Sequence, residues 1–244
     1  MIVKTVSKNI WHIAQESELI FWDEKRYEPA RLVGAIHDKY VLFTKIKTIY
    51  PQILTEPQVK RKALEIGIGP LCLGVVSLLE PAEKWEITGI DPLPRMALPK
   101  LPSYLEAFFS ELYKKNMTYV QTPAEEFDNP INSFDLVICD NVLEHTFNPH
   151  KIINNIYNLL KPGGFLVLRE NTLSHVSKWR KIIIGGKYHD KAHPVFFTYG
   201  ELIDIIRDYH YDIKYMRNDR YETLKRICGK SRRIILFCMK SINL

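Results

Sequence analysis

This 244-residue sequence has few cysteines, and they stand far apart. Cys72, Cys139, Cys228 and Cys238 include no CxxC pair, so the spacing is typical of neither a zinc site nor a disulfide framework. The pattern favours small buried thiols in a reducing compartment. No set of metal ligands is expected.

Long hydrophobic runs are also missing. Residues 1–5 lack the apolar core of a signal peptide, and no stretch approaches the ~20 apolar residues that a membrane-spanning helix needs. No internal repeat or low-complexity tract is present. With 46% hydrophobic and 25% charged residues, the composition is that of an ordinary globular protein, which we expect to be cytoplasmic.

Positive charge is concentrated near one end. The formal net charge is +6, and the segment 214–233 contains eight basic and two acidic residues, so the whole excess lies there. Such a segment either forms a solvated face or contacts an anionic acceptor such as a nucleotide sugar, a phosphorylated lipid or RNA.

The chain alternates short β-rich runs with helical patterns, which predicts an α/β fold with a doubly wound sheet. Helices are predicted from Pro29 to Tyr50 and from His150 to Leu160, and another follows Thr198. Seven strands are predicted: 63–66, 85–90, 118–121, 134–139, 165–169, 213–216 and 233–239.

We interpret the whole chain as one domain with four parts. Residues 1–58 are expected to form a helical cap over the site, and residues 59–170 the ligand-binding core. Residues 171–198 are expected to form a lid that borders the acceptor, and residues 199–244 a terminal helix and two strands.

The first core strand leads into a glycine turn. Gly67 and Gly69 follow the apolar run 63–66, and we expect a helix after them. Glycine would let a ligand approach the backbone closely, and the start of the helix would present unpaired N–H groups. An ordinary tight turn between strand and helix is the alternative.

A dinucleotide site would need a third glycine, where this chain has Cys72. The acidic Glu65 at the end of the strand also disfavours a diphosphate and suits a cationic ligand, such as a sulfonium that carries an ammonium group. Asp91 ends the second strand, where its carboxylate would accept hydrogen bonds from ribose hydroxyls. Its alternative role is as a helix cap.

Five segments in order resemble the motifs of class I S-adenosylmethionine-dependent methyltransferases, particularly the methyltransferase type 11 family. They are Glu65-x-Gly67-x-Gly69, Asp91, 122–125, 134–145 and 160–164. The resemblance implies a Rossmann-like seven-stranded sheet with a reversed final hairpin. It also implies S-adenosylmethionine as methyl donor and S-adenosylhomocysteine as product.

The resemblance places the donor across the carboxyl ends of the strands. It would contact the residues Glu65, Gly67, Gly69, Asp91, Pro92, Ala124, Glu125, Asp140 and Asn141. The family often has an acidic residue at the position of Pro123, so adenine recognition differs here. Tyr27 and Arg31 in the cap are candidates for the donor's carboxylate, although Arg31 could equally lie on the surface.

Two histidines are candidates for a general base, because imidazole titrates near neutral pH. His145 either accepts a proton or forms a wall of the donor pocket, and His193 either borders the acceptor or anchors a loop. An acceptor hydroxyl would require a base, whereas a neutral amine would not.

The function that we predict is methyl transfer to the oxygen or nitrogen of a small or glycan-like acceptor, and an anionic sugar intermediate is one candidate. One alternative is an RNA or protein methyltransferase that uses the 214–233 segment, although nucleic acid is not favoured. Another is a scaffold or regulator that binds the donor without catalysis. The oligomeric state is not predicted.

Overall fold

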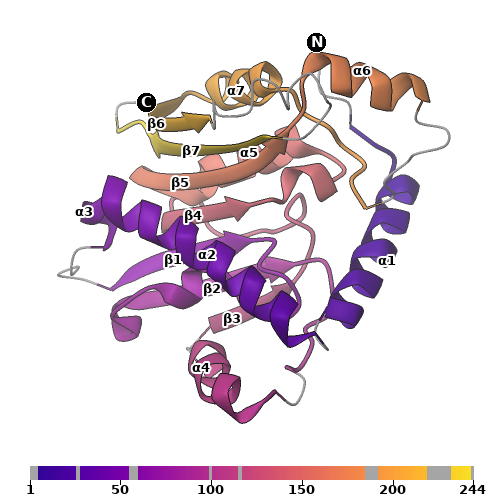
Figure 1. The fold of residues 1–244 in the computed structure, drawn as a ribbon. Helices are drawn as coiled ribbons and strands as arrows, with labels where there is room; N and C mark the ends of the chain where they lie inside the picture. The colour runs from indigo at the N-terminus through magenta and orange to yellow at the C-terminus, as the bar shows by residue number, and fades with distance from the viewer. Residues whose placement is uncertain are drawn as a thin grey trace.

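A seven-stranded sheet forms the centre of the computed structural model, which describes residues 5–25, 28–54, 60–98, 101–114, 117–184, 192–218 and 232–242 (Figure 1). The strand order is β3-β2-β1-β4-β5-β7-β6. The strands are β1 (Arg61–Ile66), β2 (Trp85–Asp91), β3 (Met117–Gln121), β4 (Phe134–Asp140), β5 (Leu160–Thr172), β6 (Tyr211–Asn218) and β7 (Arg232–Lys240).

All seven predicted strands are present, and only their ends differ. The first five run parallel, and β7 lies antiparallel to both β5 and β6. The reversed final hairpin is therefore confirmed. β5 extends to Thr172, so the first residues of the expected lid belong to the sheet.

Seven α-helices occur in the described residues. They are α1 (Lys8–Lys25), α2 (Pro29–Ile49), α3 (Pro51–Leu54), α4 (Ser103–Lys114), α5 (Pro149–Leu159), α6 (His175–Ile184) and α7 (Tyr199–Asp208). The predictions of α2, α5 and α7 are confirmed. α7 begins with a capping box, in which Thr198 and Glu201 each accept a hydrogen bond from the other's backbone N–H.

The helix expected directly after the glycine turn is absent. The chain instead makes turns and a four-residue 3-10 helix, η1 (Val75–Leu78). Pro70 and Gly74 lie in this segment, and both disfavour a continuous α-helix. The expectation that a helix start would present several free N–H groups here was wrong.

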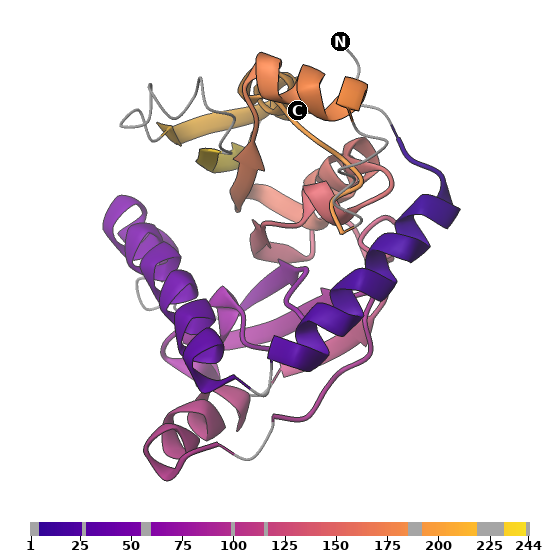
Figure 2. The ribbon, with the colours of Figure 1, turned by 45° about the vertical axis from the view of Figure 1, so that its right-hand side comes forward.

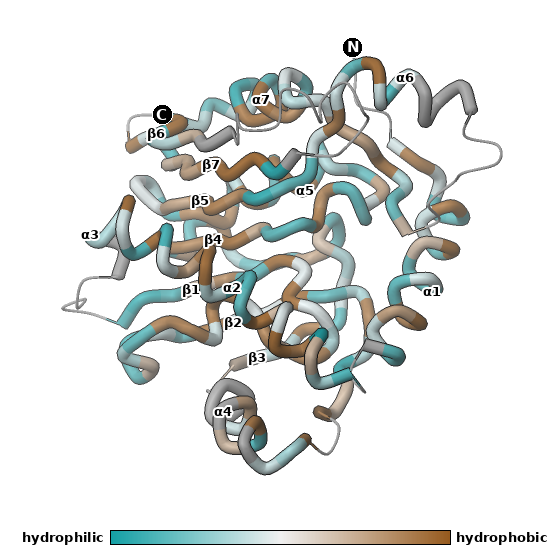
Figure 3. Tube along the Cα trace, in the orientation of Figure 1, coloured by the Kyte–Doolittle hydropathy of each residue, from teal (hydrophilic) through white to brown (hydrophobic). Residues whose placement is uncertain are grey.

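Alternating strand residues face two cores, one on each side of the sheet. On one side, α5 and α7 pack against strand residues such as Leu64 and Val137. On the other side, α2 and η1 pack against Ala63 and Leu136. Hydrophobic stretches therefore run through the central strands in Figure 3. This packing fixes the ends of β1, β2 and β4, where the candidate site lies.

The amino-terminal segment supplies two long helices that border the carboxyl ends of the strands (Figure 2). α2 was predicted, whereas α1 was not. Gln15 of α1 donates from Nε2 to the carbonyl oxygen of His145, 3.1 Å away. This contact joins α1 to η3 (Leu143–His145), the short 3-10 helix after β4.

Cys72, Cys139 and Cys238 are buried free thiols, as expected, and Cys228 lies outside the described residues. No helix among the described residues has the length and apolar character to cross a membrane. Most of the basic 214–233 segment also lies outside the described residues. Of its described side chains, Lys214 pairs with Asp212 and Arg233 pairs with Asp38.

Candidate active site

A cavity of about 560 Å³ lies at the carboxyl ends of β1, β2 and β4. This volume is within the range of small-molecule sites, about 300–1,000 Å³. Both candidate histidines line it. Eight of the candidate donor contacts do so as well: Gly67, Gly69, Asp91, Pro92, Ala124, Glu125, Asp140 and Asn141.

Gly67 and Gly69 both adopt left-handed backbone conformations, with φ of +66° and +80°. A Cβ on Gly67 would lie 2.4 Å from Cγ2 of Val142, and one on Gly69 would lie 3.2 Å from the ring of Trp22. A Cβ would therefore overlap Val142 at Gly67 and be in tight contact with Trp22 at Gly69, and both glycines line the cavity, so the close approach of a ligand to this backbone stays a prediction. The glycines are required by the turn's conformation and packing.

Asp91 connects the glycine turn to the end of β2. Its Oδ2 accepts a hydrogen bond from the N–H of Gly69 at 2.9 Å, and its Oδ1 accepts from the N–H of Leu93 at 3.0 Å. Burial raises the pKa of this carboxyl to about 6, although both hydrogen bonds lower it. Because Asp91 also lines the cavity, a bound hydroxyl donor would favour its ionised form.

Glu65 does not reach the cavity. Its side chain is fully buried between η1 and α2: Oε2 accepts a hydrogen bond from the N–H of Val76 at 2.8 Å, and Oε1 lies 3.6 Å from Nζ of Lys39. A Cβ on Gly74 would lie 2.3 Å from Oε2. Glu65 thus holds the start of η1, and the structure does not bring it to a cationic ligand.

Glu125 lines the cavity, but its carboxylate is directed at the backbone. Oε1 accepts hydrogen bonds from the N–H groups of Phe147 and Asn148, each at 2.9 Å. Burial raises the pKa of Glu125 above its usual value. The side chain therefore orders the loop that follows η3, while Ala124 and the adjacent backbone border the cavity.

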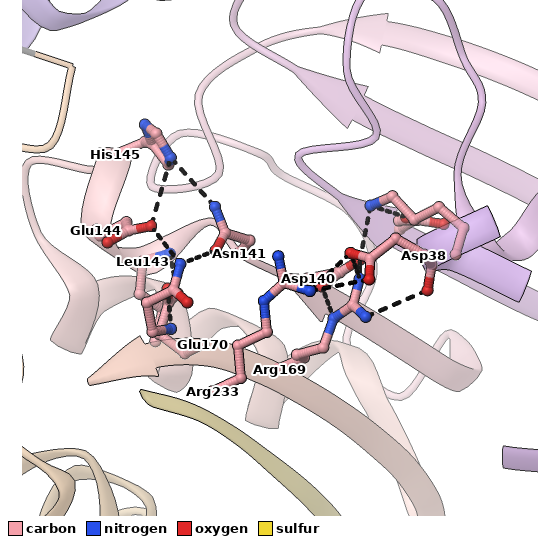
Figure 4. A network of polar contacts seen from close by, with 12 residues as sticks. Asp38, Asp140, Asn141, Leu143, Glu144, His145, Arg169, Glu170 and Arg233 are labelled. Atoms are coloured by element: carbon pink, nitrogen blue, oxygen red, sulfur yellow. Dashed lines mark hydrogen bonds and ion pairs between the residues drawn. The ribbon is translucent and has the colours of Figure 1, made fainter. Parts of the chain in front are cut away.

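Asp140, at the end of β4, is held by two cations. Nε and Nη2 of Arg169 bind its oxygens at 2.5 and 2.7 Å, and Nζ of Lys39 lies 2.7 Å from Oδ2 (Figure 4). Burial alone would raise the pKa of Asp140, but Lys39 and Arg169 together lower it to about 2. Asp140 is therefore ionised throughout the neutral range.

Asp38 extends this network to the last strand. Its carboxylate lies 3.1 Å from Arg169 and accepts from Nη1 of Arg233 at 2.9 Å (Figure 4). Sequence analysis did not identify Asp38, Lys39, Arg169 or Arg233. An arginine directly after the apolar run 165–168 was a signal in the sequence for Arg169. Only the fold, however, places its partners beside it.

Arg31 does not line the cavity. Its side chain is about half exposed and pairs with Glu28 at 2.6 Å. Two turns farther along the same helix, Lys39 reaches the cavity together with Leu32 and Ala35. The helix of the predicted cap thus borders the cavity, although the charged residue that it directs there is Lys39 and not Arg31. Tyr27 lies outside the described residues.

Glu144, His145 and His193 form a second polar group at the cavity. The Nε2 atoms of His193 and His145 lie 3.6 and 3.9 Å from Oε1 of Glu144, and the two imidazole rings are 4.5 Å apart. Asn171 at the end of β5 donates to the same Oε1 at 2.9 Å. By spacing and residue type, these three groups could also hold a metal ion.

His145 is bound to three surrounding segments. Its Nδ1 lies 2.9 Å from the carbonyl oxygen of Ala192, which can only accept, so Nδ1 donates there. Glu18 of α1 lies 3.4 Å from the same nitrogen, and Nδ2 of Asn141 lies 3.4 Å from Nε2 (Figure 4). These contacts fit the interpretation of His145 as a wall of the pocket.

The charges of the cavity suit a cationic ligand. Its lining includes five carboxylates and only three Lys or Arg side chains: Glu18, Asp38, Asp91, Glu125 and Asp140 against Lys39, Arg169 and Arg233. A diphosphate would meet an acidic lining, whereas a sulfonium with an ammonium group would be attracted. The residues present therefore fit S-adenosylmethionine better than a dinucleotide.

Comparison with known proteins agrees with this arrangement. A family model described as a methyltransferase domain matches residues 64–166. The ubiquinone biosynthesis O-methyltransferase of Glaesserella parasuis is 34% identical over 140 residues, which are 55% of each chain. The chain spans about half the length of the first such relatives.

Solved structures share the fold at low sequence identity. The phosphoethanolamine N-methyltransferase 2 of Haemonchus contortus, in complex with S-adenosylmethionine, gives a TM-score of 0.56 at 17% identity, over 81% of this chain and 52% of that chain. The [4+2]-cyclase SpnF gives 0.54 at 16% identity, over 83% and 80%. The second case shows that this fold also serves chemistry other than methyl transfer.

The matched family segment runs from β1 into β5 and contains the glycine turn, Asp91 and the end of β4. The strand order and the reversed β7 agree with the fold that the motifs imply. The chain therefore has the class I methyltransferase fold, and its residues 64–166 are similar to a methyltransferase domain.

Proposed function

We propose that this protein transfers a methyl group from S-adenosylmethionine to a hydroxyl group of a small molecule. The observation that carries the proposal is that two different groups of residues line one cavity. The glycine turn and Asp91 form the first group, and His145 and His193, which lie beside Glu144, form the second. A donor and an acceptor can thus be held together, which is most of what methyl transfer requires.

Asp91 would receive the donor's ribose hydroxyls, and Ala124 and the backbone beside it would border the adenine. Asp140 and Asn141 would lie beside the methionine end, where Lys39 offers a cation for the carboxylate in place of Arg31. When bound, S-adenosylmethionine supplies an electrophilic methyl group on a sulfonium. Positioning of the two reactants can lower the barrier by about 7–11 kcal/mol.

A hydroxyl acceptor fits the part of the cavity beside His145 and His193. A carboxylate beside two imidazoles can accept the proton that such an acceptor loses, which typically gives about 10²–10⁴-fold in rate. The O-methyltransferase activity of the ubiquinone-biosynthesis relatives favours the same acceptor chemistry. An anionic, glycan-like acceptor finds less support, since the described lining carries more carboxylates than cations.

The test is incubation of the protein with methyl-labelled donor and fractionated cell extract, followed by mass spectrometry of labelled products. A small molecule labelled on oxygen is the expected result. Labelled RNA or protein, with binding that weakens strongly in salt, would favour an acceptor bound by the 214–233 segment. Donor binding without any labelled product would favour a scaffold or regulator.

A further inference from the structure

The proposed function leaves open which histidine accepts the proton and what prepares it. His145 is already held by Ala192 on Nδ1 and approached by Asn141 on Nε2. The side chain of His193 lines the same cavity and is 28% exposed, compared with 16% for His145. The geometry therefore distinguishes the two imidazoles.

Glu144 is the residue that connects His193 to the sheet. Its side chain is 11% exposed, and Oε1 lies 3.6 Å from Nε2 of His193. A carboxylate at this position stabilises an imidazolium and orients the ring, as in other carboxylate–imidazole pairs. Glu144 itself needs a fixed orientation, because its oxygen must face His193.

Asn171 provides that orientation. Its Nδ2 donates to Oε1 of Glu144 at 2.9 Å and also to Oδ1 of Asn141. The preceding residue, Glu170, is fully buried and accepts the N–H of Leu143 at 2.7 Å (Figure 4). Two successive residues of β5 thus hold the 141–144 loop. Glu170 binds the backbone of the loop, and Asn171 binds two of the loop's side chains.

We propose that His193 and Glu144 form the proton-accepting pair for the methyl acceptor, and that Asn171 is a positioning residue for this pair. This inference rests on the proposed function. The acceptor oxygen bonds to the methyl carbon while the carbon–sulfur bond breaks, with its electron pair left on sulfur. The hydroxyl proton passes to the imidazole of His193 and from there to water.

Other ionisable groups lie near the pair of Glu144 and His193. His145 faces His193 ring to ring, and Glu18 of α1 approaches His145. Glu170 lies behind Glu144, and the interaction with Glu144 helps to raise the pKa of Glu170 well above its usual value, after the larger effect of burial. None of these groups changes in the variants below.

The test compares Asn171→Leu, which keeps the approximate size but cannot donate, with Asn171→Gln, which keeps the amide. Asn154→Leu on the exposed side of α5 is the matched control. In Asn171→Leu we expect kcat to fall by about 10-fold or more, with acceptor KM nearly unchanged and a smaller loss of donor affinity, because Asn141 loses a hydrogen bond. Asn171→Gln should recover part of the loss, and the control should behave as the wild type.

A second readout does not depend on turnover. In NMR spectra of the histidine rings, the ring signals of His193 should shift in Asn171→Leu and in Glu144→Gln but not in Asn154→Leu, because His193 then loses its oriented carboxylate. Glu144→Gln keeps the side-chain shape, so it serves if Asn171→Leu fails to fold.

Three results would overturn the inference. Unchanged ring signals of His193 in both variants would separate Asn171 and Glu144 from His193. Equal losses of donor affinity and kcat would indicate a structural role only. Activity that is lost on chelation and restored by a divalent cation would make these side chains metal ligands. If the wild type itself methylates nothing, the proposed function fails instead.

Discussion

A buried carboxylate at the tip of β2 decides how this site responds to pH. Asp91 is 6% exposed, and burial raises its pKa to about 6 from an ordinary value of 3.8. Between about pH 4 and 6 the folded state therefore holds a proton that the unfolded state has lost. Stability falls as pH rises through this window, by up to about 3 kcal/mol.

Donor binding should show the opposite dependence. Ribose hydroxyls would donate to ionised Asp91, so affinity should fall as pH drops below 6, by up to about 10-fold per pH unit. Calorimetric titration with S-adenosylhomocysteine between pH 5 and 8 measures this. In Asp91→Asn, affinity at pH 8 should be lower by about 10-fold or more and the dependence below pH 6 should disappear. A wild-type affinity that is flat with pH would refute the ribose assignment.

Gly67 tests whether the turn is fixed by its own packing. Gly67→Ala should destabilise the fold by more than the ~1–2 kcal/mol of a left-handed alanine, because the new Cβ would meet Val142. Adding Val142→Ala should recover part of that loss, as followed by urea denaturation. No rescue would mean that the backbone conformation alone demands glycine.

At the scale of elements, α2 is joined to the sheet by buried charges. Side chains of Asp140 and Arg169 are 1% and 6% exposed, and Lys39 and Asp38 of α2 complete the network. Because the pKa of Asp140 is depressed to about 2, its contribution to stability is present above about pH 4 and lost as pH falls toward 2.

Removal of one partner should therefore be costly. Arg169→Met should lower the free energy of unfolding by about 3–5 kcal/mol at pH 7, since it leaves a buried carboxylate with less compensation. Asp140→Asn should cost much less in the Arg169→Met background than in the wild type. A double-mutant cycle by chemical denaturation measures the coupling, and additive losses would show that the two side chains act independently.

The helices show which elements an apolar sequence pattern can predict and which it cannot. α5 and α7 direct apolar residues at the sheet with helical spacing, so they were predictable. α1 presents the polar residues Gln15 and Glu18 to the cavity between Trp11 and the pair Phe21 and Trp22, so its inner face has no continuous apolar periodicity to read. The prediction of a helix after Gly69 failed for a different reason, because Glu65 and Gly74 define the path of this segment through a tertiary contact.

For the whole molecule, the sheet and the position of the cavity could be predicted, because parallel strands bring their carboxyl ends to one edge. Gly67, Asp91 and Asp140 follow from that rule. Residues that other elements contribute to the site do not follow from that rule. Lys39 from the cap and Arg169 and Asn171 from β5 acquire their meaning only through partners distant in sequence.

The account predicts where a donor lies in this cavity, and a crystal structure with S-adenosylhomocysteine tests that most directly. Ribose hydroxyls should lie within hydrogen-bond distance of Asp91, with the sulfur between that end and the group of Glu144, His145 and His193. A ligand bound elsewhere, or a cavity that takes up a pyridine dinucleotide in preference, would contradict it.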